Sequence, residues 1–157
     1  MFNLKDKVVL ITGATGGIGG AIAGQMKAAG ATVVITGRSA EKLSAFDDSF
    51  IKIVSDLSAD GAADKLISDV IEKSGRIDVL INNAGITADT LMMRMSDEQF
   101  DNVLNTNLRA TFKLCRAALM PMMKQRFGRI INMASIVGVV GGAGQANYAV
   151  AKAQLLQ

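Results

Sequence analysis

The chain has 157 residues, half of them hydrophobic and a fifth charged, and its formal net charge is +3. A chain of this length and composition can bury the core of one domain, which excludes a disordered tail, and its weak, mixed charge gives no reason to expect nucleic acid or a membrane surface as a partner. It contains no histidine and a single cysteine, which excludes a histidine-based catalytic triad, a histidine-ligated metal site and a C-x-x-C pair.

The first predicted element is a strand over Val8–Ile11, a continuous apolar run of the kind that is buried on both faces of a parallel sheet. Glycines at 13, 16, 17 and 19 follow, and then apolar residues at helical spacing as far as Gly30. A helix that begins after such a turn points free N–H groups at a phosphate, and the glycines let a pyrophosphate approach the backbone. The spacing differs from the standard G-x-G-x-x-G, and a glycine turn that only permits close packing fits the same residues.

The second predicted strand, 31–36, ends at Thr36-Gly37-Arg38. In dinucleotide-binding folds an acid near this point binds the ribose 2′-hydroxyl, whereas an arginine accommodates a 2′-phosphate. No acid occurs at 36–38, so we expect NADP rather than NAD, with a solvated surface arginine as the alternative. Ser39 is placed to cap a short helix through Phe46.

Polar residues follow the next two predicted strands, 50–54 and 77–81. Asp56 and Leu57 come after the first, and Asn82-Asn83-Ala84-Gly85 after the second. The carboxyl ends of parallel strands form a ligand-binding edge, so we expect these residues there. Asp56 could instead cap the predicted helix 59–74, although Ser58 suits that role better. The amides suit contact with a ribose or plain turn chemistry.

Residues 96–99 have capping-box spacing and predict a long helix that extends to about residue 125. Its expected buried stripe is Phe100, Val103, Leu104, Leu108, Phe112, Cys115, Leu119 and Met122. Asn107 lies on or beside this stripe. A buried amide must be hydrogen-bonded, and a satisfied core amide is the ordinary explanation for such a residue.

The last predicted strand, 129–133, leads to Ser135 and then through small residues to Tyr148 and Lys152. Two residues four apart share one face of a helix. Such a pair is weak evidence by itself, but Tyr148 is the only tyrosine in the chain. Five alternations of strand and helix, without a repeat or a linker, predict an α/β fold with a doubly wound parallel sheet, a single Rossmann-type domain over 1–157.

Together, Thr12-Gly-x-x-x-Gly-Ile-Gly19, Asn82-Asn-Ala-Gly85, Asn107, Ser135 and Tyr148-x-x-x-Lys152 resemble the short-chain dehydrogenase/reductase family in order and spacing. Within that family, residues 85–95 and 144–148 are most similar to bacterial 3-oxoacyl-[acyl-carrier-protein] reductases. The resemblance implies NADPH-dependent reduction of a 3-oxoacyl thioester on acyl carrier protein, in fatty acid biosynthesis. The alternatives are another short-chain reductase, such as an acetoacetyl-CoA reductase, and a catalytically silent nucleotide-binding fragment.

The resemblance also implies a role for each site residue. Tyr148 would supply the proton, Lys152 would favour its phenolate form and bind the ribose, Ser135 would polarise the substrate carbonyl, and Asn107 would hold a water that relays protons. The residues that would bind NADP are Gly13, Thr15, Gly16, Gly17, Ile18, Gly19, Arg38, Asp56, Leu57, Asn83, Ala84, Gly85, Tyr148 and Lys152. The family usually has an arginine where Gly16 stands, which leaves the 2′-phosphate to Arg38.

The remaining expectations concern partners and the end of the chain. By analogy, Lys124, Arg126 and Arg129 would meet an acidic carrier protein, with a solvated helix end as the alternative. The family continues beyond the helix of Tyr148 with two strands and covering helices, and commonly forms a homotetramer. We therefore expect a chain truncated after the fifth strand and the start of that helix, with doubtful assembly and little turnover. A lone cysteine and a first segment without signal-peptide layout lead us to expect a cytoplasmic protein, and we expect no metal.

Overall fold

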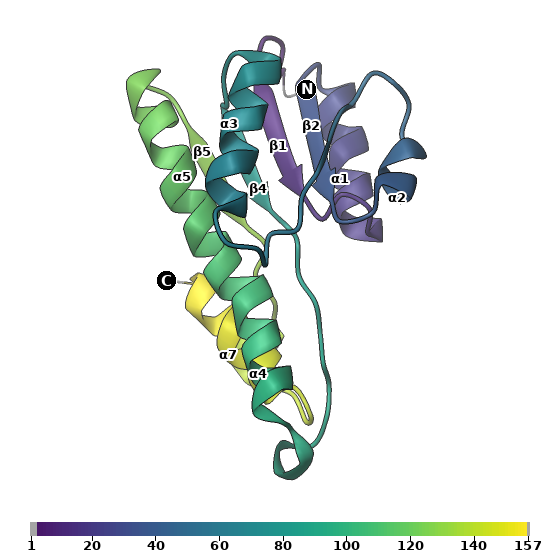
Figure 1. The fold of residues 1–157 in the computed structure, drawn as a ribbon, viewed down its shortest axis with the longest axis vertical. Helices are drawn as coiled ribbons and strands as arrows, with labels where there is room; N and C mark the ends of the chain where they lie inside the picture. Colours follow the sequence, from purple (N-terminus) through teal and green to yellow (C-terminus); the bar gives the residue numbers. More distant parts are fainter. Residues whose placement is uncertain (1–2, 157) are drawn as a thin grey trace.

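Five parallel strands form one sheet in the order β3-β2-β1-β4-β5 in the computed structural model, which describes residues 3–156 (Figure 1). They are β1 (Val8–Thr12), β2 (Thr32–Gly37), β3 (Ile51–Val54), β4 (Val79–Asn82) and β5 (Arg129–Asn132). From β1 in the centre, the chain adds β2 and then the edge strand β3 on one side. It then returns to the other side of β1 and adds β4 and the edge strand β5. This is the predicted doubly wound α/β fold, and the order reverses between β1 and β4.

Helices cover both faces of the sheet because alternate residues of each strand point to opposite sides. On one face, Val9 and Ile11 of β1 pack with α1 (Gly17–Ala28) and α2 (Ala40–Ser44). On the other, Val8 and Leu10 pack with α3 (Ala62–Ser74) and α5 (Ala110–Lys124). The other helices are η1 (Met92–Arg94), α4 (Asp97–Leu104), η2 (Asn105–Arg109), α6 (Val137–Val140), α7 (Ala146–Ala153) and η3 (Gln154–Leu156). No helix in the described part of the chain is long and apolar enough to cross a membrane.

The predicted helix over 97–125 is interrupted, and its buried stripe is only partly right. Five residues, Asn105–Arg109, form a π-helical turn between α4 and α5. Val103 and Met122 are buried as predicted, but Phe112 and Leu119 are 59% and 50% exposed. The core side of α5 carries smaller residues, among them Ala110 and Ala118. Because large apolar side chains occur on both sides of α5, periodicity could not identify the side that faces the sheet.

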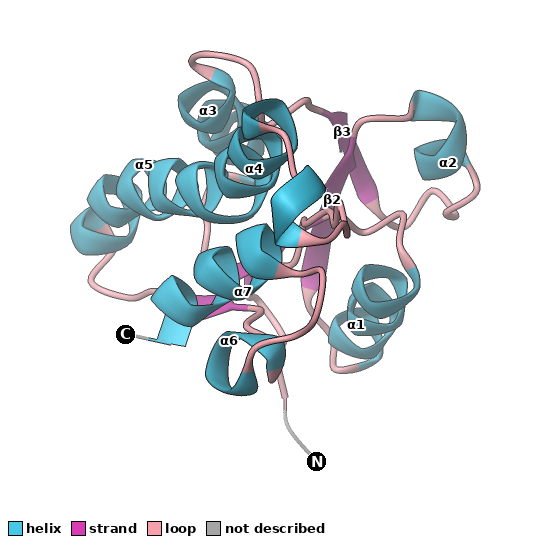
Figure 2. Ribbon diagram, turned by 90° about the horizontal axis from the view of Figure 1, so that it is seen from below, coloured by secondary structure: helices cyan, strands magenta, loops and turns pink. Residues whose placement is uncertain are grey.

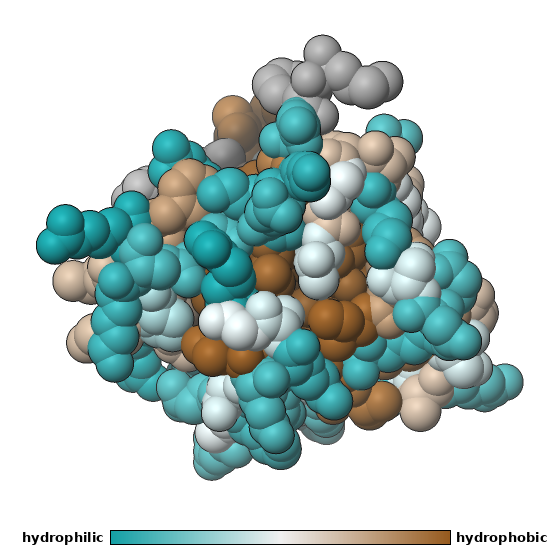
Figure 3. Space-filling model, turned by 90° about the horizontal axis from the view of Figure 1, so that it is seen from above, coloured by the Kyte–Doolittle hydropathy of each residue, from teal (hydrophilic) through white to brown (hydrophobic). Residues whose placement is uncertain are grey.

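The amino ends of β1 and β4 are joined through the buried carboxylate of Asp78. This carboxylate accepts a hydrogen bond from the Val8 N–H at 2.9 Å and two from the Arg76 guanidinium at 2.8 Å. Burial acts to raise the pKa of Asp78, but the hydrogen bonds from Arg76 and Val8, with the charges of Arg76 and Lys7, hold it below its usual value. Seen from this end, the surface carries mostly hydrophilic residues, with hydrophobic residues visible between them (Figure 3).

Candidate active site

A cleft of about 450 Å³ opens at the carboxyl ends of β1 to β4, on either side of the point where the strand order reverses. Figure 2 shows the arrangement of the helices and strands from this end of the sheet. Ligands of doubly wound sheets bind at this position. The predicted cofactor residues that line the cleft are Gly13, Thr15, Gly16, Gly17, Ile18, Gly19, Arg38, Asp56, Leu57, Asn83, Ala84 and Gly85. Tyr148 and Lys152 are not among its lining residues.

The glycines of the loop after β1 serve two different purposes. Gly13 has a φ of +64°, and a Cβ there would lie 2.8 Å from Cα of Ala84. A Cβ on Gly19 would lie 2.6 Å from Nδ2 of Asn83. A Cβ on Gly17, by contrast, would meet nothing within 4 Å, although Gly17 lines the cleft. Gly13 and Gly19 are therefore required by close packing, whereas Gly17 leaves space that a bound group can occupy.

Thr12 holds the two central strand ends together. Its Oγ1 accepts hydrogen bonds from the N–H groups of Asn83 and Ala84, both at 3.0 Å. In return, Nδ2 of Asn83 donates to the carbonyl oxygens of Thr12 and Gly13 at 3.0 and 3.1 Å. The sequence indicated Thr12 only as part of a motif. Its function in the structure is to fix the glycine loop against the end of β4.

The charge around the cleft suits an anionic ligand. The N-cap of α1, Gly16, makes no side-chain capping bond, and the first turn of α1 contains no acid, so its N–H groups are available to an anion. Arg38 and Lys42 also line the cleft, and within residues 3–156 neither forms an ion pair. Sequence reasoning missed Lys42, whose only signal is its position four residues after Arg38.

Asp56 lies at the cleft as predicted, but the expected cap at Ser58 was wrong. Helix α3 begins at Ala62, behind Gly61, which has a φ of +73°. The carboxylate of Asp56 accepts hydrogen bonds from the hydroxyl and the N–H of Ser58 at 2.7 and 3.0 Å. These two bonds, with a contribution from the charge of Arg38, hold the pKa of Asp56 below its usual value.

A second lining residue that sequence reasoning missed is Thr36. Its Oγ1 is buried, and no hydrogen-bond partner for it is present in the part of the chain that the structure describes. Buried polar groups normally have a partner in protein or in ordered water. A group bound in the cleft, or a water there, would supply one.

Asn107 is fully buried in the π-helical turn and hydrogen-bonded, as a core amide must be. Its side chain accepts from the N–H of Ile86 and donates to the carbonyl of Ile86, both at 2.8 Å. Turns of this type are frequent at functional sites. A Cβ on Gly85 would lie 3.2 Å from Asn107 Oδ1 and 3.8 Å from Lys152 Nζ. Because Gly85 has no side chain, the space beside Asn107 stays open.

Lys152 is 4% exposed, and its ammonium donates to the carbonyl oxygen of Met133 at 2.6 Å. Burial lowers the pKa of Lys152. Its Nζ lies 5.7 Å from the centre of the Tyr148 ring. Ser135 follows Met133 by two residues, and its Oγ accepts from the Val137 N–H at 3.3 Å. The structure thus brings Asn107, Tyr148 and Lys152 together beyond Gly85, at one side of the cleft.

The sheet order and the cleft at its switch point define the class of protein as Rossmann-like α/β. The sequence profile described as short chain dehydrogenase matches residues 7–157. A crystal structure of a short chain dehydrogenase from Mycobacterium smegmatis superposes with a TM-score of 0.93 at 37% identity, over 99% of this chain and 70% of that chain. The chain belongs to the short-chain dehydrogenase family.

Curated relatives give a finer comparison. The chain is 48% identical over 160 residues to 3-oxoacyl-[acyl-carrier-protein] reductase FabG of Rickettsia conorii, and 44% identical over 158 residues to the protein of that name from Escherichia coli. These alignments cover 99% and 98% of this chain. They span only 65% of each relative.

Proposed function

We propose that this chain forms the cofactor cleft and the catalytic group of an NADPH-dependent reductase acting on 3-oxoacyl thioesters carried by acyl carrier protein. The main support is the joint occurrence of an anion cradle lined by Arg38 and Lys42 and, beside it, the group of Asn107, Tyr148 and Lys152. The names of the relatives at 44–48% identity support the same substrate class.

The residues at the cleft suit the parts of NADPH. Gly16, Gly17 and the N–H groups of α1 would hold the pyrophosphate. Arg38, with Lys42, would hold the 2′-phosphate. Asp56 and Leu57 would contact the adenine, and the segment Asn83–Gly85 the ribose near the nicotinamide, with Tyr148 and Lys152 closing that end. When bound, NADPH supplies the hydride.

The catalytic side chains would handle the substrate oxygen. Ser135 donates a hydrogen bond to the ketone oxygen and polarises the carbonyl. Tyr148 gives its hydroxyl proton to that oxygen as the alcohol forms. The nearby Lys152 ammonium stabilises the phenolate that remains. The lowered pKa of Lys152 eases release of a proton in turn, and Asn107 would hold the water that receives or resupplies it.

The basic residues proposed for carrier docking are exposed but far from this cleft. Lys124 ends α5, Arg126 lies in the loop that follows, and Arg129 is the first residue of β5, at the amino edge of the sheet, opposite the cleft (Figure 1). The thioester of a carrier protein bound there would have to span the length of the sheet to reach the cleft of the same chain. We therefore do not propose that a carrier protein docked on these residues delivers its substrate to the cleft of the same chain.

Two measurements test the proposal. The first is titration of the 157-residue chain with NADPH and with NADH, followed by cofactor fluorescence; we expect saturable binding that favours NADPH. The second is single-turnover oxidation of bound NADPH by a 3-oxoacyl thioester on acyl carrier protein or on CoA, with Tyr148→Phe as the control that binds but does not react. Binding without hydride transfer to any ketone would instead support a silent nucleotide-binding module, and no binding would reject the cleft assignment.

A further inference from the structure

The segment Gly85–Thr90 runs from the cofactor cleft to the helix that carries Tyr148, and two fully buried asparagines bind its backbone. Asn107 bonds both polar groups of Ile86 at 2.8 Å. Asn147 donates from Nδ2 to the carbonyl oxygen of Ala88 at 3.2 Å. Both asparagines are 0% exposed. One segment is thus held at its cleft end and again near Tyr148.

Asn147 makes two further hydrogen bonds. Its Nδ2 also lies 3.4 Å from the carbonyl oxygen of Gln99 in α4, and its Oδ1 accepts from the N–H of Tyr148 at 2.7 Å. The N–H of Tyr148 is in the first turn of α7, where backbone donors have no partner within the helix. Asn147 therefore connects three elements: the segment 85–90, α4 and α7.

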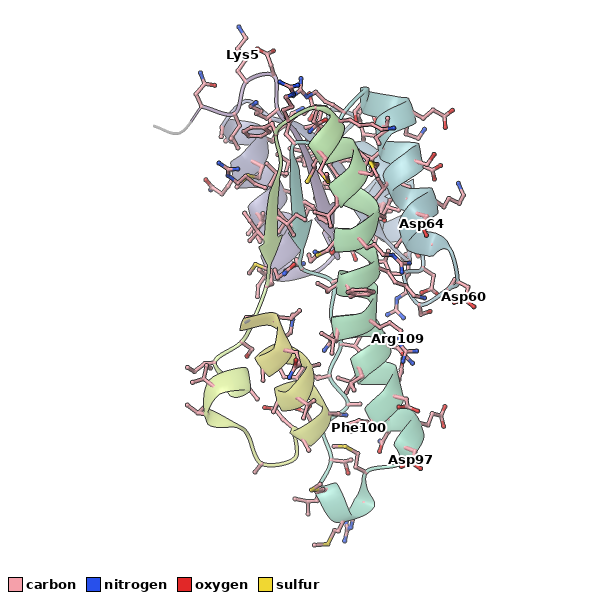
Figure 4. The ribbon with its side chains drawn as sticks, turned by 90° about the vertical axis from the view of Figure 1, so that its left-hand side faces the viewer. Lys5, Asp60, Asp64, Asp97, Phe100 and Arg109 are labelled. Carbon is pink, nitrogen blue, oxygen red and sulfur yellow. The ribbon has the colours of Figure 1, made fainter. Side chains whose placement is uncertain are left out.

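Two contacts extend this connection. The Thr90 N–H donates to the carbonyl oxygen of Gly144 at 2.9 Å, and the side-chain amide of Gln145 donates to the carboxylate of Asp89 at 2.9 Å. Helix α7 itself lies beyond the sheet, beside α4 and the π-helical turn, marked by Asp97, Phe100 and Arg109 (Figure 4). Its position relative to the cleft is set by these contacts with α4 and segment 85–90, by its packing against α6 and the π-helical turn, and by the bond of Lys152 to Met133.

We propose that Asn147 is a positioning residue for Tyr148, and this rests on the proposed reductase function. Asn107 fixes segment 85–90 at the cleft, and Asn147 joins this segment by hydrogen bonds to the first turn of α7. Without its amide, the carbonyls of Ala88 and Gln99 lose a buried donor, and the Tyr148 ring is no longer held in one place. Catalysis is sensitive to such a change, because a misplacement of about 1 Å can cost about 100-fold in rate.

The test uses Asn147→Leu, which has nearly the same size but no hydrogen bonds. Because Tyr148 is the only tyrosine, isotope-labelled tyrosine gives NMR ring signals from this residue alone, without any turnover. We expect one sharp set of signals in the unaltered chain and broadened or multiple sets in Asn147→Leu. NADPH affinity should be unchanged, and the single-turnover rate of NADPH oxidation should fall by up to about 100-fold. Identical ring signals in the two proteins would overturn the proposal.

Two controls separate positioning from loss of stability. Val70→Ala, in the buried face of α3, destabilises the chain away from Tyr148 and should leave the ring signals unaltered. Should Asn147→Leu fail to fold, Asp89→Ala removes only the exposed acceptor of Gln145, and Asp101→Ala is its exposed counterpart on α4. We then expect broader ring signals in Asp89→Ala only, and equal signals in both would overturn the proposal. Absence of NADPH binding or turnover would reject the reductase function and leave the ring measurement valid.

Discussion

Gly19 and Asn83 are in such close contact across the switch point of the sheet that a Cβ on Gly19 would lie 2.6 Å from the side-chain nitrogen of Asn83. The same nitrogen donates to the carbonyls of Thr12 and Gly13. The packing of the glycine loop and the hydrogen bonds that fix the end of β4 are therefore one arrangement. Gly17, two residues earlier, has no such neighbour.

This contrast gives a prediction for two alanine substitutions. Gly19→Ala overpacks the contact with Asn83 and should lower the free energy of unfolding by about 1–3 kcal/mol. Gly17→Ala meets no protein atom, so stability should hold or rise slightly, while NADPH affinity falls because the methyl group occupies the cradle. Chemical denaturation and NADPH titration of both variants provide the check. Equal NADPH affinity in Gly17→Ala and the unaltered chain would count against the cradle.

The two basic residues that line the cleft, Arg38 and Lys42, predict selectivity for the 2′-phosphate. Arg38→Ala and Lys42→Ala each remove a charged donor, and a hydrogen bond to a charged group contributes about 1.5–3 kcal/mol. Each should therefore weaken NADPH binding and leave NADH binding unaltered. Raising the salt concentration should weaken NADPH binding less in the variants than in the unaltered chain. The matched control is Lys73→Ala on the exposed side of α3. If this variant weakens NADPH binding as much, neither Arg38 nor Lys42 binds the 2′-phosphate.

Asp78 predicts a pH-dependent contribution to stability. Its pKa is lowered in the folded chain, so its stabilising effect is complete above the pKa of the unfolded chain and is lost as the pH falls through the lower folded value. Asp78→Ala leaves the buried Val8 N–H without an acceptor, which should cost about 1–3 kcal/mol at neutral pH. Urea unfolding of both proteins should show this difference narrowing as the solution is acidified. A difference that stays constant down to the acid limit would show that the carboxylate charge contributes nothing.

Lys152 predicts a second rise of stability with pH, in the alkaline rather than the acidic range. Burial lowers its pKa in the folded chain, so the unfolded chain holds the proton more tightly, and charged Lys152 costs stability below the folded pKa. As the pH rises towards the ordinary lysine value of about 10.4, that cost disappears. Relative to Lys152→Met, the unaltered chain should therefore gain stability as the pH rises from neutral to about 10.4. We also expect that Lys152→Met reduces no ketone at any pH. Parallel stability curves for the two proteins would indicate a lysine that is not desolvated.

The amino-acid sequence by itself determined the strands and the edge at which the cleft lies. Apolar runs such as Val8–Ile11 are stable only where both faces are covered, which requires a parallel sheet with helices on each side. In such a sheet, residues that follow different strands, such as Gly13 and Asn83, meet at one edge whatever their separation along the chain. The cleft residues were predictable because strand direction alone places them there.

The tertiary structure alone decided which side of α5 faces the sheet, which further residues reach the cleft, and how α7 is held beside it. The side of α5 that faces the sheet depends on packing, since Phe112 and Leu119 are as apolar as the residues that are buried. Lys42 reaches the cleft from α2, through the path of the chain after β2, which no local pattern encodes. Asn147 finds its acceptors 59 and 48 residues away. A hydrogen bond between distant residues depends on where two backbones meet, and that position is set only when the whole core has packed.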